Sequence, residues 1–168
     1  MITVAIGNET VTIVIEVLRY ENSMAGDPSD ANWLSCCVDI QVPPFQGRFN
    51  SALTTRDFLR FRHDLEIAMA RMEGKASLTA EEGGICVEID LSTTGRANVL
   101  GYSKTLGVAK VHLTFGFETD QSFLQNTLRA LNEVVQHFPP IYLSAGKPPH
   151  PPRKLSELIK FPVRVPLH

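Results

Sequence analysis

Three cysteines and five histidines are the side chains of this sequence best suited to metal binding or nucleophilic chemistry. Cys36 and Cys37 are adjacent, and Cys86 is distant from both. Adjacent cysteines form a disulfide only with backbone distortion, and a reactive thiol needs a nearby cation or helix N-terminus to lower its pKa. The sequence neighbours Ser35 and Asp39 supply neither. We therefore expect reduced thiols without a catalytic role.

The histidines give no metal-binding pattern. They are His63, His112, His137, His150 and His168, and no H-x-x-H, H-E-x-x-H or C-x-x-C spacing occurs. The glycines at positions 83, 84 and 95 fall in expected turns and do not open a helix as a G-x-G-x-x-G motif would. The sequence therefore predicts no metal site and no cofactor.

Acidic side chains form one further cluster that could do chemistry. Glu88 and Asp90 share the polar face of an expected strand, and Glu81 and Glu82 precede that strand. Such a pattern fits either a paired-carboxylate site or a solvated strand face, and the second is more common. No nucleophile-elbow motif supports a Ser-His-Asp arrangement. We therefore predict no catalytic residues and no enzyme.

The charge of the chain is unevenly distributed, although its net value is only −2. Residues 1–137 contain 11 Lys or Arg and 17 Asp or Glu, a net charge of −6. Residues 138–168 contain five basic residues and one acidic residue, a net charge of +4. Such charge acts mainly on association rate and partner choice. The acidic body favours a basic protein partner over nucleic acid.

The lone tryptophan, Trp33, follows a loop that carries Asp27 and Asp30. An indole at the start of a strand can close one end of the core while its N–H group reaches a polar partner. Tryptophan is also enriched among binding hot spots, so Trp33 with an acidic rim is a candidate contact. The candidate partner-binding residues are Asp27, Asp30, Trp33, Glu88 and Asp90.

Alternation of apolar and polar residues predicts antiparallel strands along most of the chain. The expected strands are residues 10–18, 34–42 and 45–50, followed by three or four strands within residues 75–118. The strand that starts at residue 34 ends at Pro43 and Pro44, which cannot donate to a ladder. Residues 21–32 are rich in turn formers and are expected to form a loop.

Apolar residues at intervals of three or four predict two amphipathic helices. The first follows a cap at Thr54 and ends before Gly74, and the second starts near Thr119 or Asp120 and ends before Pro139. Their apolar faces consist of Phe58, Phe61, Leu65, Met69 and Met72 in the first helix, and of Leu124, Leu128, Leu131, Val135 and Phe138 in the second.

The last 30 residues hold eight of the 11 prolines, a composition that favours extended backbone. We therefore predict one domain, residues 1–138, and a basic proline-rich tail, residues 139–168. No internal repeat is visible. The order of strands and helices predicts an α+β fold in which an antiparallel β-sheet packs against two α-helices, with a proline-rich C-terminal extension.

No run of residues approaches the roughly 18 apolar positions that a membrane span needs. The N-terminus also lacks the basic region that begins a signal peptide. The sequence therefore predicts no membrane association and a cytoplasmic location.

Four motifs carry a resemblance to a known family. They are D-A-N-W-L at 30–34, L-T-T-R-D-F-L-R-F at 53–61, G-I-C-V-E-I-D-L at 84–91, and D-Q-S-F-L-Q-N-T-L-R-A-L at 120–131. The last of these precedes F-P at 138–139. Over residues 10–139 the chain resembles bacterial WapI-like immunity proteins, and its proline-rich tail departs from their pattern. The resemblance implies a cytoplasmic inhibitor without catalytic activity that binds the toxic C-terminal domain of a contact-dependent toxin, in the founding case one that cleaves tRNA.

Two other hypotheses stay open at this point. One is a small enzyme or ligand-binding domain with a pocket between sheet and helices that uses Glu88, Asp90 or His112. It requires a deep pocket with converging polar groups, whereas an inhibitor of a toxin does not. The other is that the proline-rich tail docks on a sister chain and makes the protein a homo-oligomer.

Overall fold

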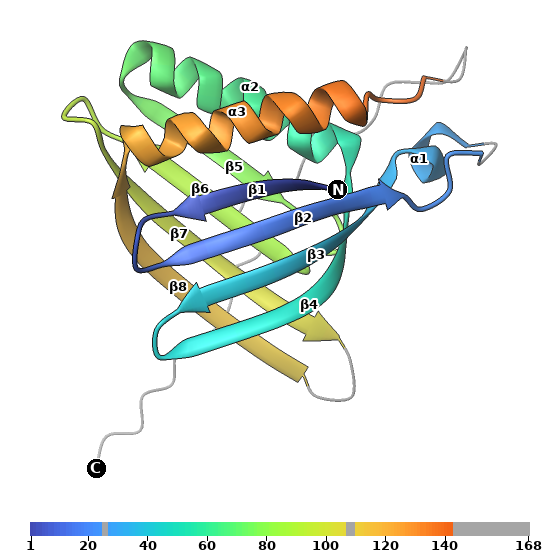
Figure 1. Ribbon diagram of the computed structural model, residues 1–168, viewed down its shortest axis with the longest axis horizontal. Helices are drawn as coiled ribbons and strands as arrows, with labels where there is room; N and C mark the ends of the chain where they lie inside the picture. Colours follow the sequence, from blue (N-terminus) through green and yellow to red (C-terminus); the bar gives the residue numbers. More distant parts are fainter. Residues whose placement is uncertain (25–26, 107–109, 143–168) are drawn as a thin grey trace, which may run out of the picture.

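The computed structural model describes residues 1–24, 27–106 and 110–142, which contain eight strands and three helices (Figure 1). The predicted α+β fold class is confirmed. The predicted proline-rich tail lies outside the described residues from position 143 onward. The division into a domain of residues 1–138 and a tail stays a prediction.

The first sheet is an antiparallel meander in the order β1-β2-β3-β4. Its strands are β1 (Ile2–Gly7), β2 (Thr12–Tyr20), β3 (Trp33–Val42) and β4 (Phe45–Thr54). The predicted hairpin is confirmed, because Val42 pairs with Phe45 across Pro43 and Pro44. Strand β1 was not among the predicted strands, although its residues alternate in the same way as those of β2.

The second sheet repeats this meander in the order β5-β6-β7-β8. Its strands are β5 (Gly74–Thr79), β6 (Ile85–Leu91), β7 (Arg96–Leu106) and β8 (Lys110–Asp120). The sequence predicted three or four strands in this part of the chain, and the structure has four.

The helices connect and follow the two sheets. They are α1 (Pro28–Ala31), α2 (Thr55–Arg71) and α3 (Gln121–His137). Helix α1 is a single turn within the segment 21–32, where the sequence predicted only a loop. The predicted N-cap of α2 at Thr54 is confirmed, and α3 starts after Asp120, as the predicted start near Thr119 or Asp120 requires.

The strands form two sheets that face each other, rather than one sheet. Figure 1 shows α2 and α3 next to each other at one end of this sandwich, with α2 against β5 and α3 against β1. Four strands followed by a long helix therefore occur twice. This structural repeat left no visible trace in the sequence, because the same backbone order is built from different side chains.

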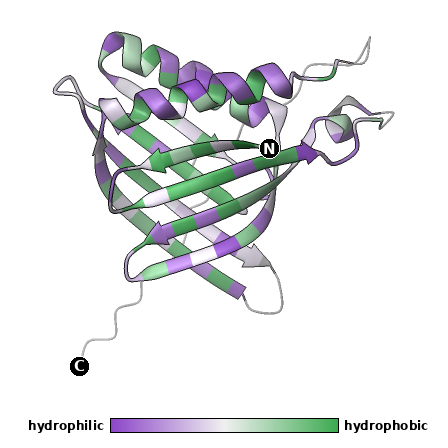
Figure 2. Ribbon diagram, in the orientation of Figure 1, coloured by the Kyte–Doolittle hydropathy of each residue, from purple (hydrophilic) through white to green (hydrophobic). Residues whose placement is uncertain are grey.

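A single core joins both sheets and both long helices. Green apolar and purple polar residues alternate along most strands in Figure 2, as expected when only one face of each strand is buried. Ile15 of the first sheet, Val87 of the second and Phe61 of α2 are all completely buried. Burial of each such side chain stabilises the fold by about 1.5–3 kcal/mol.

Reciprocal hydrogen bonds fix the start of α2. The backbone N–H of Asp57 donates to Thr54 Oγ1 over 3.2 Å, and the backbone N–H of Thr54 donates to Asp57 Oδ2 over 2.8 Å. This capping box satisfies two groups that the helix cannot pair itself. Burial raises the pKa of Asp57, although the hydrogen bonds from Thr54 act in the opposite direction.

Two threonines attach the second half of the chain to β1. Thr127 of α3 donates to the carbonyl of Ala5, and Thr119 at the end of β8 donates to the carbonyl of Gly7, each over 2.6 Å. The buried face of α3 consequently includes Thr127 and Val134, and the predicted Val135 is only half-buried.

Gly101 is the first position at which we predict a strong effect of mutation. A Cβ atom there would lie 2.4 Å from the carbonyl oxygen of Cys86 and 2.6 Å from the ring of Phe115. We expect Gly101→Ala to lower the free energy of unfolding by about 1–3 kcal/mol, because β6 and Phe115 must move. Urea unfolding followed by circular dichroism measures the change.

Gly47 provides the matched control. It also lies in a strand, but no atom lies within 4 Å of a Cβ built there. Gly47→Ala should change the free energy of unfolding by no more than about 0.5 kcal/mol. Equal effects of the two substitutions would contradict the packing around Gly101.

Candidate partner-binding surfaces

The three cysteines are free and buried. Cys36 lies in the core, where burial raises the pKa of its thiol to about 12, and burial also raises the pKa of Cys86. The described residues contain no group of three or more His, Cys, Asp or Glu side chains that could hold a metal ion. The segment around Cys36 and Cys37 is therefore a strand whose thiols pack.

Cys37 faces the outer side of the first sheet, where the sequence did not place a cation beside it. Arg48 of β4 reaches this position and contacts Glu16 Oε2 over 2.7 Å and Asp39 Oδ2 over 3.6 Å. Interaction with Cys37, Glu16 and Asp39 raises the pKa of Arg48. Arg48 thus serves two carboxylates, so this group keeps a net negative charge.

Two of the predicted contact residues form an acidic corner around α1. Asp27 caps this helix by accepting a hydrogen bond from the backbone N–H of Ser29 over 2.7 Å, and Asp30 is exposed. Trp33 follows as the first residue of β3 and is half-buried. The backbone N–H of Glu21 donates to the Trp33 carbonyl over 2.9 Å, which holds the base of the corner.

Asn32, between Asp30 and Trp33, has a structural role that the sequence analysis missed. Its side chain is almost completely buried, with 2% of its surface exposed. Its amide oxygen accepts hydrogen bonds from Thr55 Oγ1 and from the backbone N–H of Ile141, and its Nδ2 donates to the Ile141 carbonyl, over 2.8–2.9 Å. Asn32 therefore joins β3, the start of α2 and the segment after α3. The one sequence signal for this role was the position of Asn32 directly before a strand with alternating apolar residues.

The other predicted contact residues lie on the outer face of the second sheet. Lys75 Nζ contacts Glu88 Oε1 over 3.2 Å and Asp90 Oδ2 over 3.1 Å. Hydrogen bonds to Asp90 and Glu88 raise the pKa of Lys75. Because one cation serves two carboxylates, this group keeps a net negative charge.

An exposed leucine lies at the centre of the same face. Leu100 is 60% exposed and pairs with Glu88 on one side and Gly116 on the other. Its Cδ2 atom would be only 2.9 Å from a Cβ on Gly116, so the glycine makes room for the leucine. We call this surface the second-sheet face. It is formed by Lys75, Glu88, Asp90, Asn98, Leu100, Gly116 and Glu118, which line a hollow of about 500 Å³.

The five predicted residues therefore belong to two separate surfaces. Asp27, Asp30 and Trp33 form the acidic corner beside the first sheet, whereas Glu88 and Asp90 lie on the second-sheet face. Both sheets turn their apolar faces toward the shared core, so their outer faces point away from each other. The two surfaces do not form a single site.

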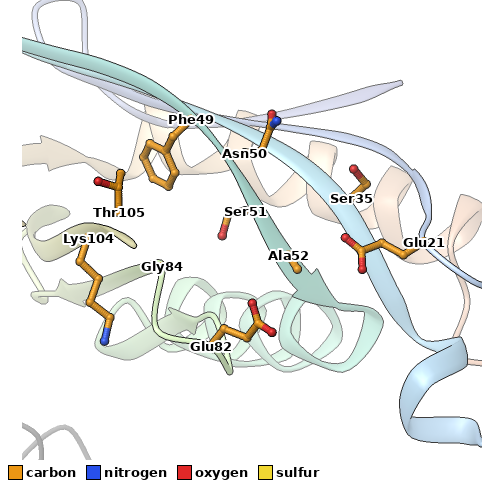
Figure 3. A pocket seen from close by; sticks show the side chains of 10 residues that line it. All are labelled: Glu21, Ser35, Phe49, Asn50, Ser51, Ala52, Glu82, Gly84, Lys104 and Thr105. Atoms are coloured by element: carbon orange, nitrogen blue, oxygen red, sulfur yellow. The ribbon is translucent and has the colours of Figure 1, made fainter. Parts of the chain in front are cut away.

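A second hollow follows the free edge of β4 and measures about 470 Å³. Figure 3 shows the ten residues that line it, which come from strands of both sheets and from the turns next to them. Phe49, Asn50, Ser51 and Ala52 form its β4 side. We call this hollow the β4-edge groove. The remaining lining residues are Glu21, Ser35, Glu82, Gly84, Lys104 and Thr105.

The β4-edge groove depends on a close approach of backbone at Gly84. A Cβ atom on Gly84 would lie 2.9 Å from Ser51 Oγ, and the neighbouring Gly83 has a φ of +71° under the Lys104 side chain. The turn between β5 and β6 can therefore lie against β4 only with small residues at these positions. In Figure 3, Glu21 and Glu82 extend toward Ala52 from opposite sides.

The alternative hypothesis placed a pocket between sheet and helices. In the described part of the chain, Phe58, Phe61 and Leu131 occupy that region and are completely buried. The two hollows described above lie elsewhere, on an outer sheet face and along a strand edge. His112 packs edge-on against Tyr102, with ring centroids 5.9 Å apart, on the outer side of the second sheet.

Comparison with protein families decides the relationship of this chain. The immunity protein WapI-like family matches residues 1–139. The chain belongs to this family. The resemblance seen in its motifs is thereby confirmed, and the match ends before most of the proline-rich tail. In this WapI-like protein, no helix among the described residues is long and apolar enough to cross a membrane.

Comparison with individual proteins adds little. No curated protein matches this WapI-like chain significantly. The Trypanosoma brucei MRP1/MRP2 structure is 13% identical, with a TM-score of 0.43 over 80% of this chain and 83% of that chain. The CdiA-CT/CdiI toxin and immunity complex from Enterobacter cloacae is 12% identical, with a TM-score of 0.40 over 71% and 97%. Similarities this weak carry no argument here.

We predict that Asn32→Ala destabilises this WapI-like protein by about 1–3 kcal/mol, because buried groups of Thr55 and Ile141 lose their partner. Urea unfolding followed by circular dichroism measures the difference. Asn22→Ala, at an exposed position of the same segment, is the matched control and should change stability by less than about 0.5 kcal/mol. Equal stabilities of the two variants would contradict the role of Asn32.

The raised thiol pKa values predict slow alkylation of the native protein. At pH 8, well below the pKa of about 12 of Cys36, its reactive thiolate form is nearly absent. We expect iodoacetamide to leave Cys36 and Cys86 unmodified in the native state and to modify all three cysteines in denaturant, as measured by peptide mass spectrometry. Modification of native Cys36 at the rate seen in denaturant would show that the thiol is accessible.

Proposed function

We propose that this protein is a non-catalytic inhibitor that binds and neutralises a cognate bacterial toxin domain, one encoded beside it, in the cytoplasm of the producing cell. The observation that carries the proposal is the match of the WapI-like immunity protein family to residues 1–139. An inhibitor of this kind needs a binding surface and no catalytic group.

Charge supports a nuclease as the toxin. A nuclease must attract phosphate and is therefore usually basic around its active site. Residues 1–137 of this protein carry a net charge of −6. Opposite charge increases the rate of encounter and favours the correct orientation of the partners.

The second-sheet face is the better of the two candidate surfaces for this partner. Leu100 offers an exposed apolar anchor, and Glu88, Asp90 and Glu118 surround it with carboxylates. Binding energy concentrates in such anchors when a rim of polar contacts keeps water away. The acidic corner offers Trp33 as an anchor, but this side chain is already half-buried in the fold.

Isothermal titration calorimetry with the toxin domain encoded beside this protein tests the proposal. We expect tight binding with one partner per toxin domain, and loss of the toxin's activity in the complex. Leu100→Ala should raise Kd at least about ten-fold. Ile67→Ala is the matched control, because Ile67 is a partly exposed apolar residue on α2, and it should leave Kd unchanged.

The carboxylates are tested by the double substitution Glu88→Gln with Asp90→Asn. It leaves Lys75 unpaired, so we expect slower association and a weaker dependence of the association rate on salt. No binding of the wild-type protein would reject the proposed function. Binding that is lost in Trp33→Ala and unchanged in the Leu100 and carboxylate variants would move the interface to the acidic corner.

A further inference from the structure

Strand β4 is an edge strand of the first sheet, and among the described residues the turn between β5 and β6 approaches it at Ser51. The long helices pack on β5 and β1, and within the described residues no further strand pairs with β4 beyond β3. All ten residues of β4 pair with β3 without a register shift, so no bulge interrupts this strand. Natural proteins usually protect such edges with charges, prolines, bulges or a covering segment.

The side chains of β4 give this edge little protection. Residues 45–54 contain no proline and one charged residue, Arg48, which is already paired with Glu16 and Asp39. Phe45 is 63% exposed, and Phe49 is only half-buried. Among the described residues, this edge of β4 therefore has no neighbouring strand to bond its backbone, and it carries apolar surface.

The β4-edge groove lies along this edge. Four consecutive residues of β4 line it. Phe49 and Ser51 belong to the inner face of this strand, and Asn50 and Ala52 belong to its outer face. A hollow that contacts both faces of one strand follows the edge of that strand. Glu21 and Glu82 flank the hollow, and Lys104 is the one cation among its lining residues (Figure 3).

The chain leaves the described domain close to one end of this groove. The Tyr20 hydroxyl donates to the Pro139 carbonyl over 2.6 Å, and Asn32 holds the backbone of Ile141. Glu21 directly follows Tyr20, and its backbone N–H donates to the carbonyl of Trp33, which directly follows Asn32. The proline-rich tail therefore starts beside the acidic residue at the groove.

The sequence of the tail fits this edge. Residues 143–168 carry five basic residues and one acidic residue, which complements Glu21 and Glu82. The longest stretch of the tail without proline is 153–161, RKLSELIKF, whose nine residues all have a backbone N–H group to offer a strand. Strand β4 has ten residues. Residues 143–152 connect the described domain to this stretch. An extended proline-rich segment spans about 3.1 Å per residue, which is enough to reach along β4.

We propose that residues 153–161 of the protein's own tail pair with the free edge of β4 and fill the β4-edge groove. In an antiparallel pairing, main-chain hydrogen bonds to β4 provide the affinity, Ile159 and Phe161 cover Phe45 and Phe49, and Lys154 approaches the carboxylates of Glu21 and Glu82. The family match ends at residue 139, so this segment lies outside the part of the chain that matches the family.

Amide hydrogen exchange of the full-length protein, without any toxin, tests the pairing. Ile159→Pro removes one donor and disrupts a paired strand. We expect amides of residues 45–52 to exchange at least about ten-fold faster in this variant than in the wild type, while amides of β6 stay unchanged. Leu167→Pro, an apolar-to-proline change outside the pairing segment, is the matched control and should leave β4 as in the wild type.

Zero-length carbodiimide cross-linking of the full-length protein identifies the occupant. Cross-links of Lys154 to Glu21 or Glu82 within one chain support the proposal. If a mixture of light and heavy isotope-labelled chains gives these cross-links between chains, the occupant is the tail of a second copy and docking within one chain is overturned. Equal exchange of β4 in all variants overturns the pairing itself.

Discussion

The mutual burial of two sheet faces is the constraint on which the rest of the structure depends. Each four-stranded meander has one apolar face, and the two faces share one core that α2 and α3 close at one end. Because this core uses the apolar faces of the strands, the candidate binding surfaces described above lie outside it: an outer sheet face, a strand edge and the acidic corner around α1.

A few polar contacts determine how the halves of the chain meet. Thr119 and Thr127 attach β8 and α3 to β1, and Asn32 joins β3, α2 and the segment after α3. Each places a hydrogen-bonding side chain where a backbone group would otherwise be buried without a partner. These contacts are structural. Asn32 is a buried residue of the D-A-N-W-L motif, so this part of the motif reports on the fold and not on a binding surface.

The second-sheet face and the β4-edge groove differ in what they offer. The first combines an exposed leucine with carboxylates and one lysine, which suits the folded surface of a basic protein. The second combines unpaired backbone with apolar and acidic side chains, which suits an extended basic segment. The two proposals, a docked tail and a bound toxin, therefore use different surfaces of one molecule.

The sequence by itself determined the α+β class, the hairpin at Pro43 and Pro44, both long helices with the cap at Thr54, and the family, because these depend on local periodicity and short motifs. Only the tertiary structure decided that the strands form two facing sheets, that Asp27, Asp30 and Trp33 lie apart from Glu88 and Asp90, and that Leu100 is exposed beside Gly116. The physical reason is that alternation shows which residues share a face of a strand, whereas the packing of the sheets determines where that face lies.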